Sequence, residues 1–488
     1  MDYTGVFILV VSFIVLLSMG VPIAFSIGIS GIVTMLVTVD SLPAFTTFAQ
    51  RMATGLDSFA LLAIPFFILA GNIMNSGGIA HRLIDFAKVL VGNLTGGLAY
   101  VNVIANMLFG AISGSAAAAA SAIGSIMGTE MKKENYDVNF SAAINISSAT
   151  TGLSIPPSNV LIVYSLASGG ASITALFLAG YVPGILTGLA IMITGMGMLI
   201  LKRDGIIGLF KVLVKLAIIG VVIFAFVYGL IYAHDNFNTG IYRTIWIGLI
   251  LAFLAYSVYK TITNKEIARI GFKKFVDAIP SLFLLVIVIG GIVAGYFTAT
   301  EASAVAVLYA LILAMVYKEV KWKDLPEILL SSVKTTGIVM LLVATCMGLS
   351  WIMAYENIPQ TVSAGLLNIS DNPYVILLII NLILLFVGVF MDMTPAILIF
   401  TPIFLPIVQS QLGLSPIHFG IIMVLNLSVG LCTPPVGSVL FIGCSVSKVK
   451  IETVIKPLLP MFMAMIVILM LATYIPELSL WLPELFGF

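Results

Sequence analysis

Charged residues are scarce in this sequence. Asp, Glu, Lys and Arg together make up 9% of its 488 residues, against about 25% in an ordinary soluble domain. The 22 basic and 21 acidic side chains nearly cancel, so the net charge indicates no nucleic-acid partner. A water-soluble globular fold is therefore not expected, and the lipid bilayer is the predicted surroundings of the chain.

Groups that carry out catalysis or bind metals are also few. The three cysteines, Cys346, Cys432 and Cys444, lie in apolar surroundings without metal-binding or disulfide spacing. The sequence contains no GxxxxGK[ST] phosphate loop, which argues against an ATP-driven pump. It also shows no cluster of acid and base groups, so the chain is not expected to be an enzyme.

Hydrophobic residues, at 61% of the sequence, are gathered in long runs. A helix needs about 20 apolar residues to cross the hydrocarbon layer. The stretch 5–39 lacks the basic start and the cleavage site of a secretory signal, so we expect two retained membrane helices hinged near Gly20 and Pro22. Further membrane helices are predicted at about 57–75, 139–169, 172–201, 209–233, 243–259, 280–298, 302–317, 335–355, 418–447 and 457–476.

Two stretches, 94–131 and 374–411, depart from this pattern, because small or polar residues interrupt each in the middle. The interruptions are Ser113–Ser115 and Asp392–Pro395. Lipid offers no partner to backbone groups freed at such a break, so protein, water or an ion must satisfy them. Both stretches are therefore predicted to be re-entrant helical hairpins.

The basic residues predict the orientation. If each hairpin returns to the side from which it starts, nearly all lysines and arginines fall on one side, and only Arg51 and Arg243 fall opposite. The positive-inside rule places that basic side in the cytoplasm. Both termini are then periplasmic, the first hairpin starts from the cytoplasm, and the second starts from outside.

Hairpins of opposite orientation are what an inverted repeat predicts, and the sequence repeats itself accordingly. Gly152–Pro157 and Gly430–Pro435 agree at four of six positions, and each follows a broken hairpin by about 40 residues. Two adjacent prolines prevent a continuous helix. We therefore predict an all-α polytopic membrane protein of two inverted repeats, each with a re-entrant hairpin and a discontinuous helix.

A discontinuous helix exposes carbonyl groups at one broken end and N–H groups at the other, so it can hold a cation or an anion. Oxygen donors suit a small hard cation such as Na⁺. Asp392 is the strongest single candidate, because a carboxylate at membrane depth is costly; its alternative role is to cap the next helix. Any single serine could instead serve close packing. The donors near the breaks are Ser113, Ser115, Asn145, Ser147, Ser148, Thr150 and Thr151, and Asp392, Thr394, Asn426, Ser428 and Thr433.

Several motifs together resemble one family. They are the run Ser58–Gly71, the Ser113–Ser115 tip with its alanines, Glu130–Lys133, Pro156–Ser158, Thr298–Ala302, Thr401–Pro406 and His418–Gly437. Over nearly the whole chain, and in this order, the sequence is similar to the large membrane subunit (M subunit, DctM type) of tripartite ATP-independent periplasmic (TRAP) transporters.

The resemblance implies an elevator-type, secondary active importer that couples Na⁺ to the uptake of an organic acid across the bacterial inner membrane. Its implied partners are a small membrane subunit of four helices (Q type) and a soluble periplasmic substrate-binding protein (P type). Apart from the coupling Na⁺, no cofactor is implied. The implied cation-binding residues are Ser113, Gly114, Ser115, Ser148, Thr151, Gly152 and Pro156 in one site, and Asp392, Thr394, Asn426, Gly430, Thr433 and Pro434 in the other. The implied substrate-binding residues are Ser158, Asn159, Gly437 and Ser438.

The resemblance also divides the chain into parts. The transport part would be 94–171 (hairpin 94–131, broken helix 139–169) and 374–447 (hairpin 374–411, broken helix 418–447), and the scaffold would be 1–93, 172–207, 261–373 with a connecting arm, and 448–488. Residues 208–260 depart from the family pattern by adding two apolar helices, either a docking surface for the small subunit or a brace. A proton-coupled importer or an exchanger of organic anions is the remaining alternative, and C4-dicarboxylates, sugar acids and sialic acids all remain possible substrates.

Overall fold

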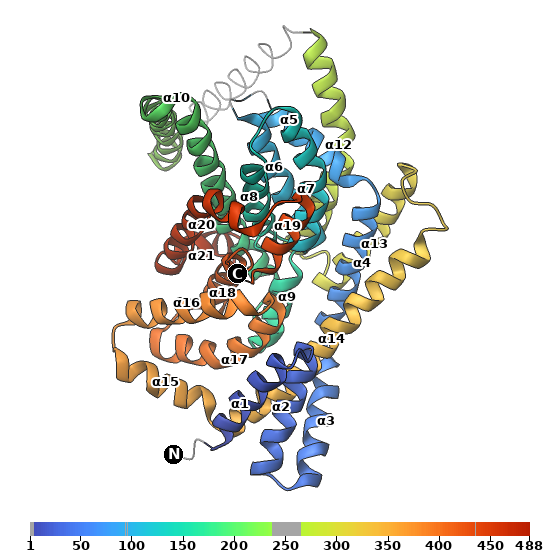
Figure 1. Ribbon diagram of the computed structural model, residues 1–488, viewed down its shortest axis with the longest axis vertical. Coiled ribbons are helices and arrows are strands. Elements are labelled where there is room, and N and C mark those ends of the chain that lie inside the picture. Colours follow the sequence, from blue (N-terminus) through green and yellow to red (C-terminus); the bar gives the residue numbers. More distant parts are fainter. Residues whose placement is uncertain (1–3, 93, 95, 237–264, 435) are drawn as a thin grey trace.

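The computed structural model describes residues 4–92, 94, 96–236, 265–434 and 436–488, and Figure 1 shows them as a bundle of helices. Within these ranges every regular element is a helix and no strand occurs. Eight helices of this part are long and apolar enough to cross a membrane, which confirms the predicted all-α membrane fold. These spans are Phe59–Ser76, Ile173–Arg203, Val276–Val293, Ala299–Val316, Leu325–Tyr355, Pro373–Phe390, Met393–Leu412 and Ile451–Tyr474.

One group of helices comes from the start and the middle of the chain. Its members are α1 (Thr4–Ser18), α2 (Ile23–Thr38), α3 (Ser41–Leu56), η1 (Phe59–Leu62), α4 (Ala63–Ser76), α12 (Lys265–Val293), α13 (Ala299–Val316) and α14 (Leu325–Tyr355). α2, α3 and α4 pack along α14, and α13 packs against α4 and α12. Gly20, with a φ of 79°, and Pro22 lie between α1 and α2, so the predicted break is confirmed. The two helices, of 15 and 16 residues, are shorter than the eight membrane-length helices.

Glycines allow the helices of this first group to approach closely. The ring of Phe48 on α3 is buried between α2 and α14. A Cβ on Gly31 of α2 would lie 2.9 Å from that ring, and one on Gly348 of α14 would lie 2.6 Å from it. Both distances are shorter than a normal carbon contact, so a larger residue at either position would push the ring out.

The second group contains both predicted hairpins and both broken helices. Its members are α6 (Gly97–Ser113), α7 (Ala116–Lys133), α8 (Val138–Ala149), η2 (Thr151–Leu153), α9 (Asn159–Ala167), α10 (Ile173–Asn236), α16 (Pro373–Phe390), α17 (Met393–Leu412), α18 (Pro416–Gly430), α19 (Ser438–Ser447), α20 (Ile451–Tyr474) and α21 (Glu477–Leu485). α6 packs against α7, and α16 against α17, as expected of two hairpins. α16 and α17 are each of membrane-spanning length, so their length alone does not require them to be re-entrant.

α10 and α20 lie with the second group. α10 packs against α6, α18 and α20, and α20 packs against α8 and α18. Residues 172–207 and 448–488 are predicted as scaffold, and two helices that begin within them, α10 and α20, contact the first hairpin and the broken helices directly.

Two short amphipathic helices, α5 (Ile79–Val91) and α15 (Ile358–Ile369), join the two groups. α5 packs against α6 and α12, and α15 packs against α14 and α17. α5 buries an apolar face that includes Leu83 and Ile84, whereas its polar residues Asp85 and Lys88 form ion pairs. Because both helices are short and amphipathic, no long apolar run in the sequence predicts them.

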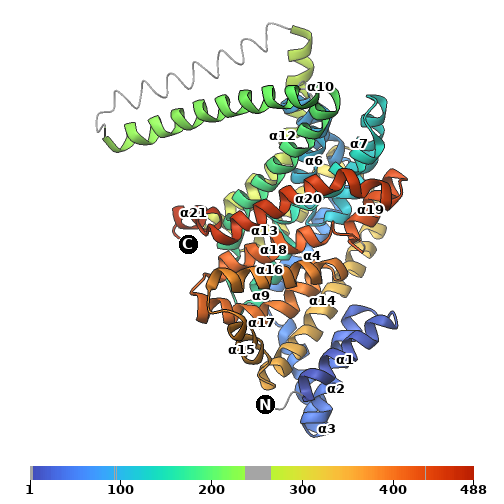
Figure 2. The ribbon, with the colours of Figure 1, turned by 60° about the vertical axis from the view of Figure 1, so that its left-hand side comes forward.

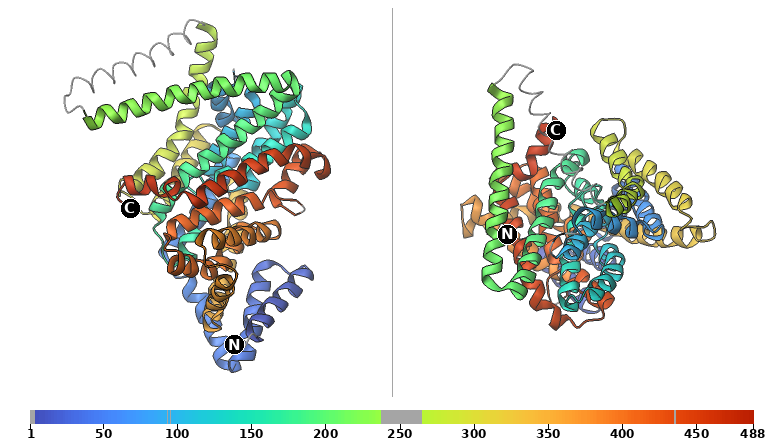
Figure 3. Two further views of the ribbon diagram at one scale, coloured as in Figure 1. Left: turned by 90° about the vertical axis from the view of Figure 1, so that its left-hand side faces the viewer. Right: turned by 90° about the horizontal axis from the view of Figure 1, so that it is seen from above.

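α10 changes direction at Gly205, whose φ of 67° and ψ of −168° interrupt the helical backbone. Figures 2 and 3 show the segment after Gly205 projecting from the rest of the bundle. The predicted extra helix at 209–233 corresponds to this segment, which is helical as far as Asn236. The second predicted extra helix, 243–259, lies outside the described residues.

Candidate ion and substrate site

The tip of the first hairpin is two residues long, because α6 ends at Ser113 and α7 begins at Ala116. Gly114 has a φ of 62°, which glycine adopts without the strain that a side chain adds. The hydroxyl of Ser115 accepts a hydrogen bond from the N–H of Ala118 at 3.2 Å, and the hydroxyl of Ser113 donates to the carbonyl of Ser115 at 3.4 Å. The three predicted tip residues thus form one tight turn.

The first broken helix passes directly beside this hairpin. Its first part, α8, ends at Ala149, and its second part, α9, begins at Asn159. A Cβ on Gly110 of the hairpin would lie 2.9 Å from the Cα of Gly152, and one on Gly114 would lie 2.7 Å from the Nδ2 of Asn159. The hairpin and the break therefore touch backbone to backbone, and the structure brings Gly152 and Asn159 next to the predicted tip.

The second hairpin and the second broken helix repeat this arrangement. A Cβ on Gly388 of α16 would lie 3.1 Å from the Cα of Gly430 at the end of α18. The spacing from Gly110 to Gly388 equals the spacing from Gly152 to Gly430. The two halves therefore cross at corresponding glycines, and the alignment of the two breaks extends to the hairpins.

Asp392 occupies the N-cap position of α17 but accepts no N-cap hydrogen bond there. Ser115, at the corresponding tip, does accept one. The side chain of Asp392 is exposed, and Thr394 follows it in the first turn of α17. The usual N-cap hydrogen bond is therefore absent, and among the described residues the carboxylate of Asp392 accepts only from the N–H of Met393, the first residue of α17.

The comparison with known families agrees with these features. A family model described as the DctM component of tripartite ATP-independent periplasmic transporters matches residues 10–478, a range that includes both hairpins and both broken helices. The chain belongs to this family. The predicted resemblance to TRAP large membrane subunits is confirmed, and the family is one of transporter permeases rather than enzymes.

Relatives of this TRAP permease match it along its full length. The uncharacterized protein YgiK of Salmonella typhimurium is 50% identical over 100% of both chains. The sialic acid TRAP transporter large permease protein SiaM of Vibrio cholerae is 36% identical over 96% of both chains. The C4-dicarboxylate TRAP transporter large permease protein DctM of Pseudomonas aeruginosa is also 36% identical, over 95% of this chain and 94% of that one.

A solved structure shares the fold. MtrF of Neisseria gonorrhoeae, described as one of a class of antimetabolite efflux pumps, superposes with a TM-score of 0.54 over 90% of this chain and 86% of that chain. The two sequences are 11% identical, so the similarity concerns the fold of the TRAP permease alone.

Clusters of amide side chains fasten each hairpin of the TRAP permease to its broken helix. In the first half, the Nδ2 of Asn106 donates to the Oδ1 of Asn102 at 2.8 Å and to the hydroxyl of Ser148 at 2.9 Å. In the second half, the Nδ2 of Asn426 donates to the Oδ1 of Asn381 at 2.8 Å. Asn106 lies about two helical turns before Ser113 on α6. Ser148, a predicted cation ligand bonded to Asn106, therefore lies about two turns from the first tip.

Asn102, Asn106 and Asn381 are not among the predicted site residues. The signal that could have found them is an asparagine within an apolar helix, since a buried amide needs a partner. Asn102 and Asn106 are also one helical turn apart, so they share a face of α6.

Three buried amide oxygens have no hydrogen-bond partner among the described residues, namely the Oδ1 atoms of Asn106, Asn159 and Asn426. Buried acceptors are nearly always paired with protein, water or an ion. Asn426 is a predicted cation ligand, and Asn159, predicted for substrate, lies beside the first tip. Each oxygen can therefore accept from a donor or coordinate a cation.

The remaining predicted cation ligands lie within the breaks. The hydroxyls of Thr151 and Thr433 donate to the carbonyls of Ser148 and Val429, at 2.6 and 2.9 Å. Because their protons are used in this way, their oxygens act only as acceptors toward any further partner. Pro156 and Pro434 have no backbone N–H of their own, so each break has one donor fewer than acceptors at that residue.

The predicted substrate residues lie at the starts of α9 and α19. Ser158 precedes α9, and its buried hydroxyl donates to the carbonyl of Leu153 at 2.6 Å. Gly437 precedes α19, which begins at the exposed Ser438. α9 packs against α17 of the second hairpin, and α19 packs against α7 of the first. The two halves therefore interlock, each broken helix ending against the other hairpin.

Proposed function

We propose that this chain is the translocating subunit of a secondary active transporter that imports an organic acid by symport with Na⁺ across the bacterial inner membrane. Membership of the TRAP permease family supports the transport role. The sialic acid and C4-dicarboxylate in the names of SiaM and DctM support an organic acid as cargo. The geometry of the two hairpins supports the cation.

The observation that carries the proposal is the glycine crossing in each half. A glycine crossing is the close backbone contact of Gly110 with Gly152 in the first half and of Gly388 with Gly430 in the second. Each contact brings a hairpin tip to the end of a broken helix, where carbonyl groups lose their helical partners. No lysine or arginine occurs in 94–131 or 374–411. The donors that gather there are hydroxyl, amide, carbonyl and carboxylate oxygens, which fit Na⁺ better than a softer metal.

The predicted residues would hold two ions. One Na⁺ would bind between Ser113–Ser115 and Gly152–Pro156, close to Asn159. The other would bind between Asp392–Thr394 and Gly430–Pro434, close to Asn426. Bound Na⁺ would supply positive charge beside the N-termini of α9 and α19, which already favour an anion, so ion and carboxylate would bind better together than apart.

The arrangement of the helices supports an elevator-type movement. The hairpins and broken helices, together with α10 and α20, would form the moving body, and α2–α4 with α12–α14 would form the static one. α5 lies between them: its Asp85 pairs with Lys274 of α12 at 2.8 Å, and its Lys88 pairs with Glu130 of α7 at 2.9 Å. α5 and α15 would act as the arms that keep the bodies connected.

The proposal includes two partners. A small four-helix membrane subunit would bind the static helices, and a soluble periplasmic protein would capture the acid and deliver it. Both termini would then face the periplasm, as the distribution of lysine and arginine predicts. The tripartite family supports a complex of this kind.

Asp392 gives the alternative coupling ion a specific basis. Its uncapped carboxylate could carry a proton instead of binding Na⁺, which would make the chain a proton-coupled importer, or an exchanger if no net ion movement occurs. The two mechanisms differ in which gradient drives uptake.

The test is uptake of a radiolabelled acid into liposomes that contain this chain and its small subunit, with the binding protein outside. An inward Na⁺ gradient and an inward proton gradient are imposed separately, for the wild type, Asp392→Asn and Ser113→Ala. Our proposal expects uptake driven by Na⁺ alone, weakened by both substitutions and absent without the binding protein. Uptake driven equally well by protons alone would contradict it.

A further inference from the structure

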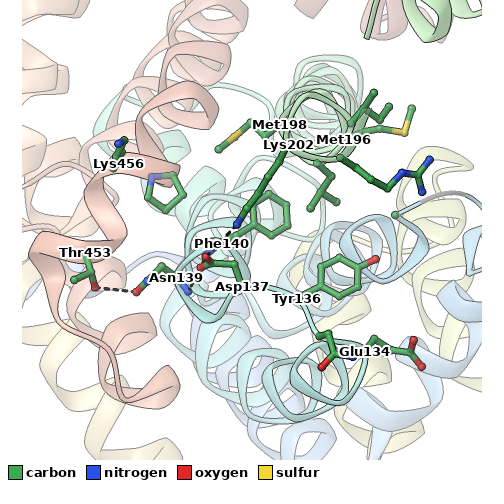
Figure 4. Close-up of a pocket in the computed structure, with 16 residues that line it drawn as sticks. Glu134, Tyr136, Asp137, Asn139, Phe140, Met196, Met198, Lys202, Thr453 and Lys456 are labelled. Carbon is green, nitrogen blue, oxygen red and sulfur yellow. Dashed lines mark hydrogen bonds and ion pairs between the residues drawn. The ribbon is translucent and has the colours of Figure 1, made fainter. Parts of the chain in front are cut away.

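A pocket of about 940 Å³ lies beside the middle of α10 and the start of α20, and no residue of either hairpin tip lines it. It is lined by the last residues of the apolar part of α10, by the start of α20 and by the connection between α7 and α8 (Figure 4). None of its residues belongs to the predicted Na⁺ or substrate sites.

The pocket lies where lipid headgroups are expected. The apolar segment of α10 ends at Arg203, and α20 begins at Ile451, so Lys202 and Lys456 stand at the boundary of the hydrocarbon layer. Lysines 132, 133, 448 and 450 lie at the same ends of neighbouring helices. The positive-inside rule assigns this basic end to the cytoplasm, the side where anionic lipids create a negative surface potential.

The lining has two chemical sides. Phe140, Met196, Leu199 and Pro457 are apolar, whereas Lys202, Lys456, Asn139 and Thr453 are polar. Figure 4 shows Lys202 reaching toward Asp137, and Thr453 bonded to Asn139. This combination suits an amphiphile with an anionic head, because an acyl chain can follow the apolar side while lysines meet the phosphate.

The charges in the pocket are only partly neutralised. Lys202, Arg203 and Lys456 face two acidic residues, Glu134 and Asp137. Lys202 lies 3.5 Å from Asp137, and Lys456 forms no salt bridge with any residue that the structure describes. Lys456 is therefore available to bind an anion. Lys202 could bind the same anion if the anion displaced the carboxylate of Asp137.

We infer that this pocket binds the headgroup of an anionic phospholipid of the cytoplasmic leaflet. The phosphodiester lies between Lys202 and Lys456, and the adjacent acyl chain covers Met196 and Leu199. Asp137 competes with the phosphate for Lys202 and so limits the affinity. This site is independent of the proposed transport chemistry, and its test requires no transport.

The test is native mass spectrometry of the purified full-length chain, titrated with phosphatidylglycerol or with phosphatidylcholine of the same acyl chains. Phosphatidylglycerol is expected to bind more tightly by about twenty-five-fold, because each of the two lysines near an anionic lipid contributes roughly a factor of five. Lys456→Gln, which breaks no salt bridge, should weaken this binding about fivefold, and Lys202→Gln with Lys456→Gln should abolish the preference.

Two further variants make the test specific. Asp137→Asn keeps the Oδ1 that accepts the capping hydrogen bonds of α8 but removes the charge, so it should tighten phosphatidylglycerol binding. The pair Lys321→Gln and Lys334→Gln removes two exposed lysines from the same predicted side, outside the pocket, and should change nothing.

The inference would be overturned by equal binding of the two lipids, by phosphatidylglycerol binding that survives both pocket substitutions, or by weaker phosphatidylglycerol binding in Asp137→Asn. Full competition by glycerol 3-phosphate at the concentration of the lipid would also contradict it, because the pocket would then recognise a soluble phosphate without its acyl chains.

Discussion

Gly152 gives the sharpest test of the glycine crossing. A Cβ at this position would lie 2.4 Å from the Cα and 2.6 Å from the carbonyl carbon of Gly110. Both contacts are with backbone, which cannot turn aside as a flexible side chain can. Gly152→Ala must therefore separate the first hairpin from the first broken helix.

The magnitude follows from these distances. Carbon atoms in contact lie about 3.5–4.0 Å apart, so the two backbones must move apart by about 1 Å. Overpacking of this kind costs roughly 1–3 kcal/mol of stability. Binding sites tolerate displacements of about 0.5 Å, so the apparent affinity for Na⁺ should fall about tenfold or more.

The assay is thermal unfolding of the purified chain over a Na⁺ titration, with choline replacing Na⁺ at constant ionic strength. A ligand that binds only the folded protein raises the unfolding midpoint once its concentration exceeds its dissociation constant. For Gly152→Ala the rise should begin at about tenfold higher Na⁺ than for the wild type. The midpoint without Na⁺ should also be lower.

Two control variants separate loss of the site from general strain. Gly31→Ala places a Cβ 2.9 Å from the ring of Phe48, far along the chain from either break, and should lower the midpoint without changing the Na⁺ response. Gly128→Ala meets nothing within 4 Å and should change neither. If Gly152→Ala keeps the wild-type Na⁺ response, or Gly31→Ala loses it equally, the crossing does not build an ion site.

Other predictions concern single side chains. Asp392→Asn should weaken the Na⁺-dependent rise of the unfolding midpoint about tenfold but leave the midpoint without Na⁺ unchanged, because no N-cap hydrogen bond is lost and the amide oxygen can still accept from the N–H of Met393. A lower midpoint in choline would contradict this. Asn426→Leu should lower the free energy of unfolding by about 1–3 kcal/mol, because the buried Oδ1 of Asn381 loses the N–H that Asn426 donates to it. Asn381→Leu should lower the free energy of unfolding by at least as much, and chemical denaturation measures both. The backbone N–H groups of Phe140 and Asn139, with Lys202 nearby, hold the pKa of Asp137 below its usual value. Its stabilising effect should therefore be complete at neutral pH and be lost progressively as the pH falls below about 4, through the lowered pKa of the folded state. Asp137→Asn should flatten this part of the stability curve against pH.

Much of the helical layout could be predicted from local sequence. Length and hydropathy place most of the long membrane helices, because one apolar run of sufficient length is a sufficient signal. The Pro156–Pro157 and Pro434 segments predict the two breaks, because proline acts on its own backbone and on the residue before it. The hairpin tips were also predictable, since polar residues in the middle of an apolar run require a local explanation.

What the sequence did not predict depends on contacts between distant elements. α5 and α15 are short and amphipathic, so no apolar run reveals them, and their position between two packed groups defines their role. The contacts of α10 and α20 with the hairpins and the broken helices have the same cause, because the apolar spans of both helices could pack against either group and their composition does not decide between them. The role of Asn106 also depends on distant contacts, because its amide joins the hairpin to the broken helix only if Ser148 lies within hydrogen-bond distance, beside Asn102.

The glycine crossing depends on a contact between distant residues, but the internal repeat makes it recognisable in the sequence. Glycine is common in membrane helices, so Gly110 and Gly388 carry no signal individually. Once the two breaks are aligned on Gly152 and Gly430, the same spacing places Gly110 over Gly388. A residue that matters only through a distant contact then appears twice at corresponding positions, which random placement would rarely produce. The two halves of an inverted repeat can therefore be aligned with each other, as two related sequences would be. Positions that are identical in both halves, and not only the polar residues, are where substitutions should be made first.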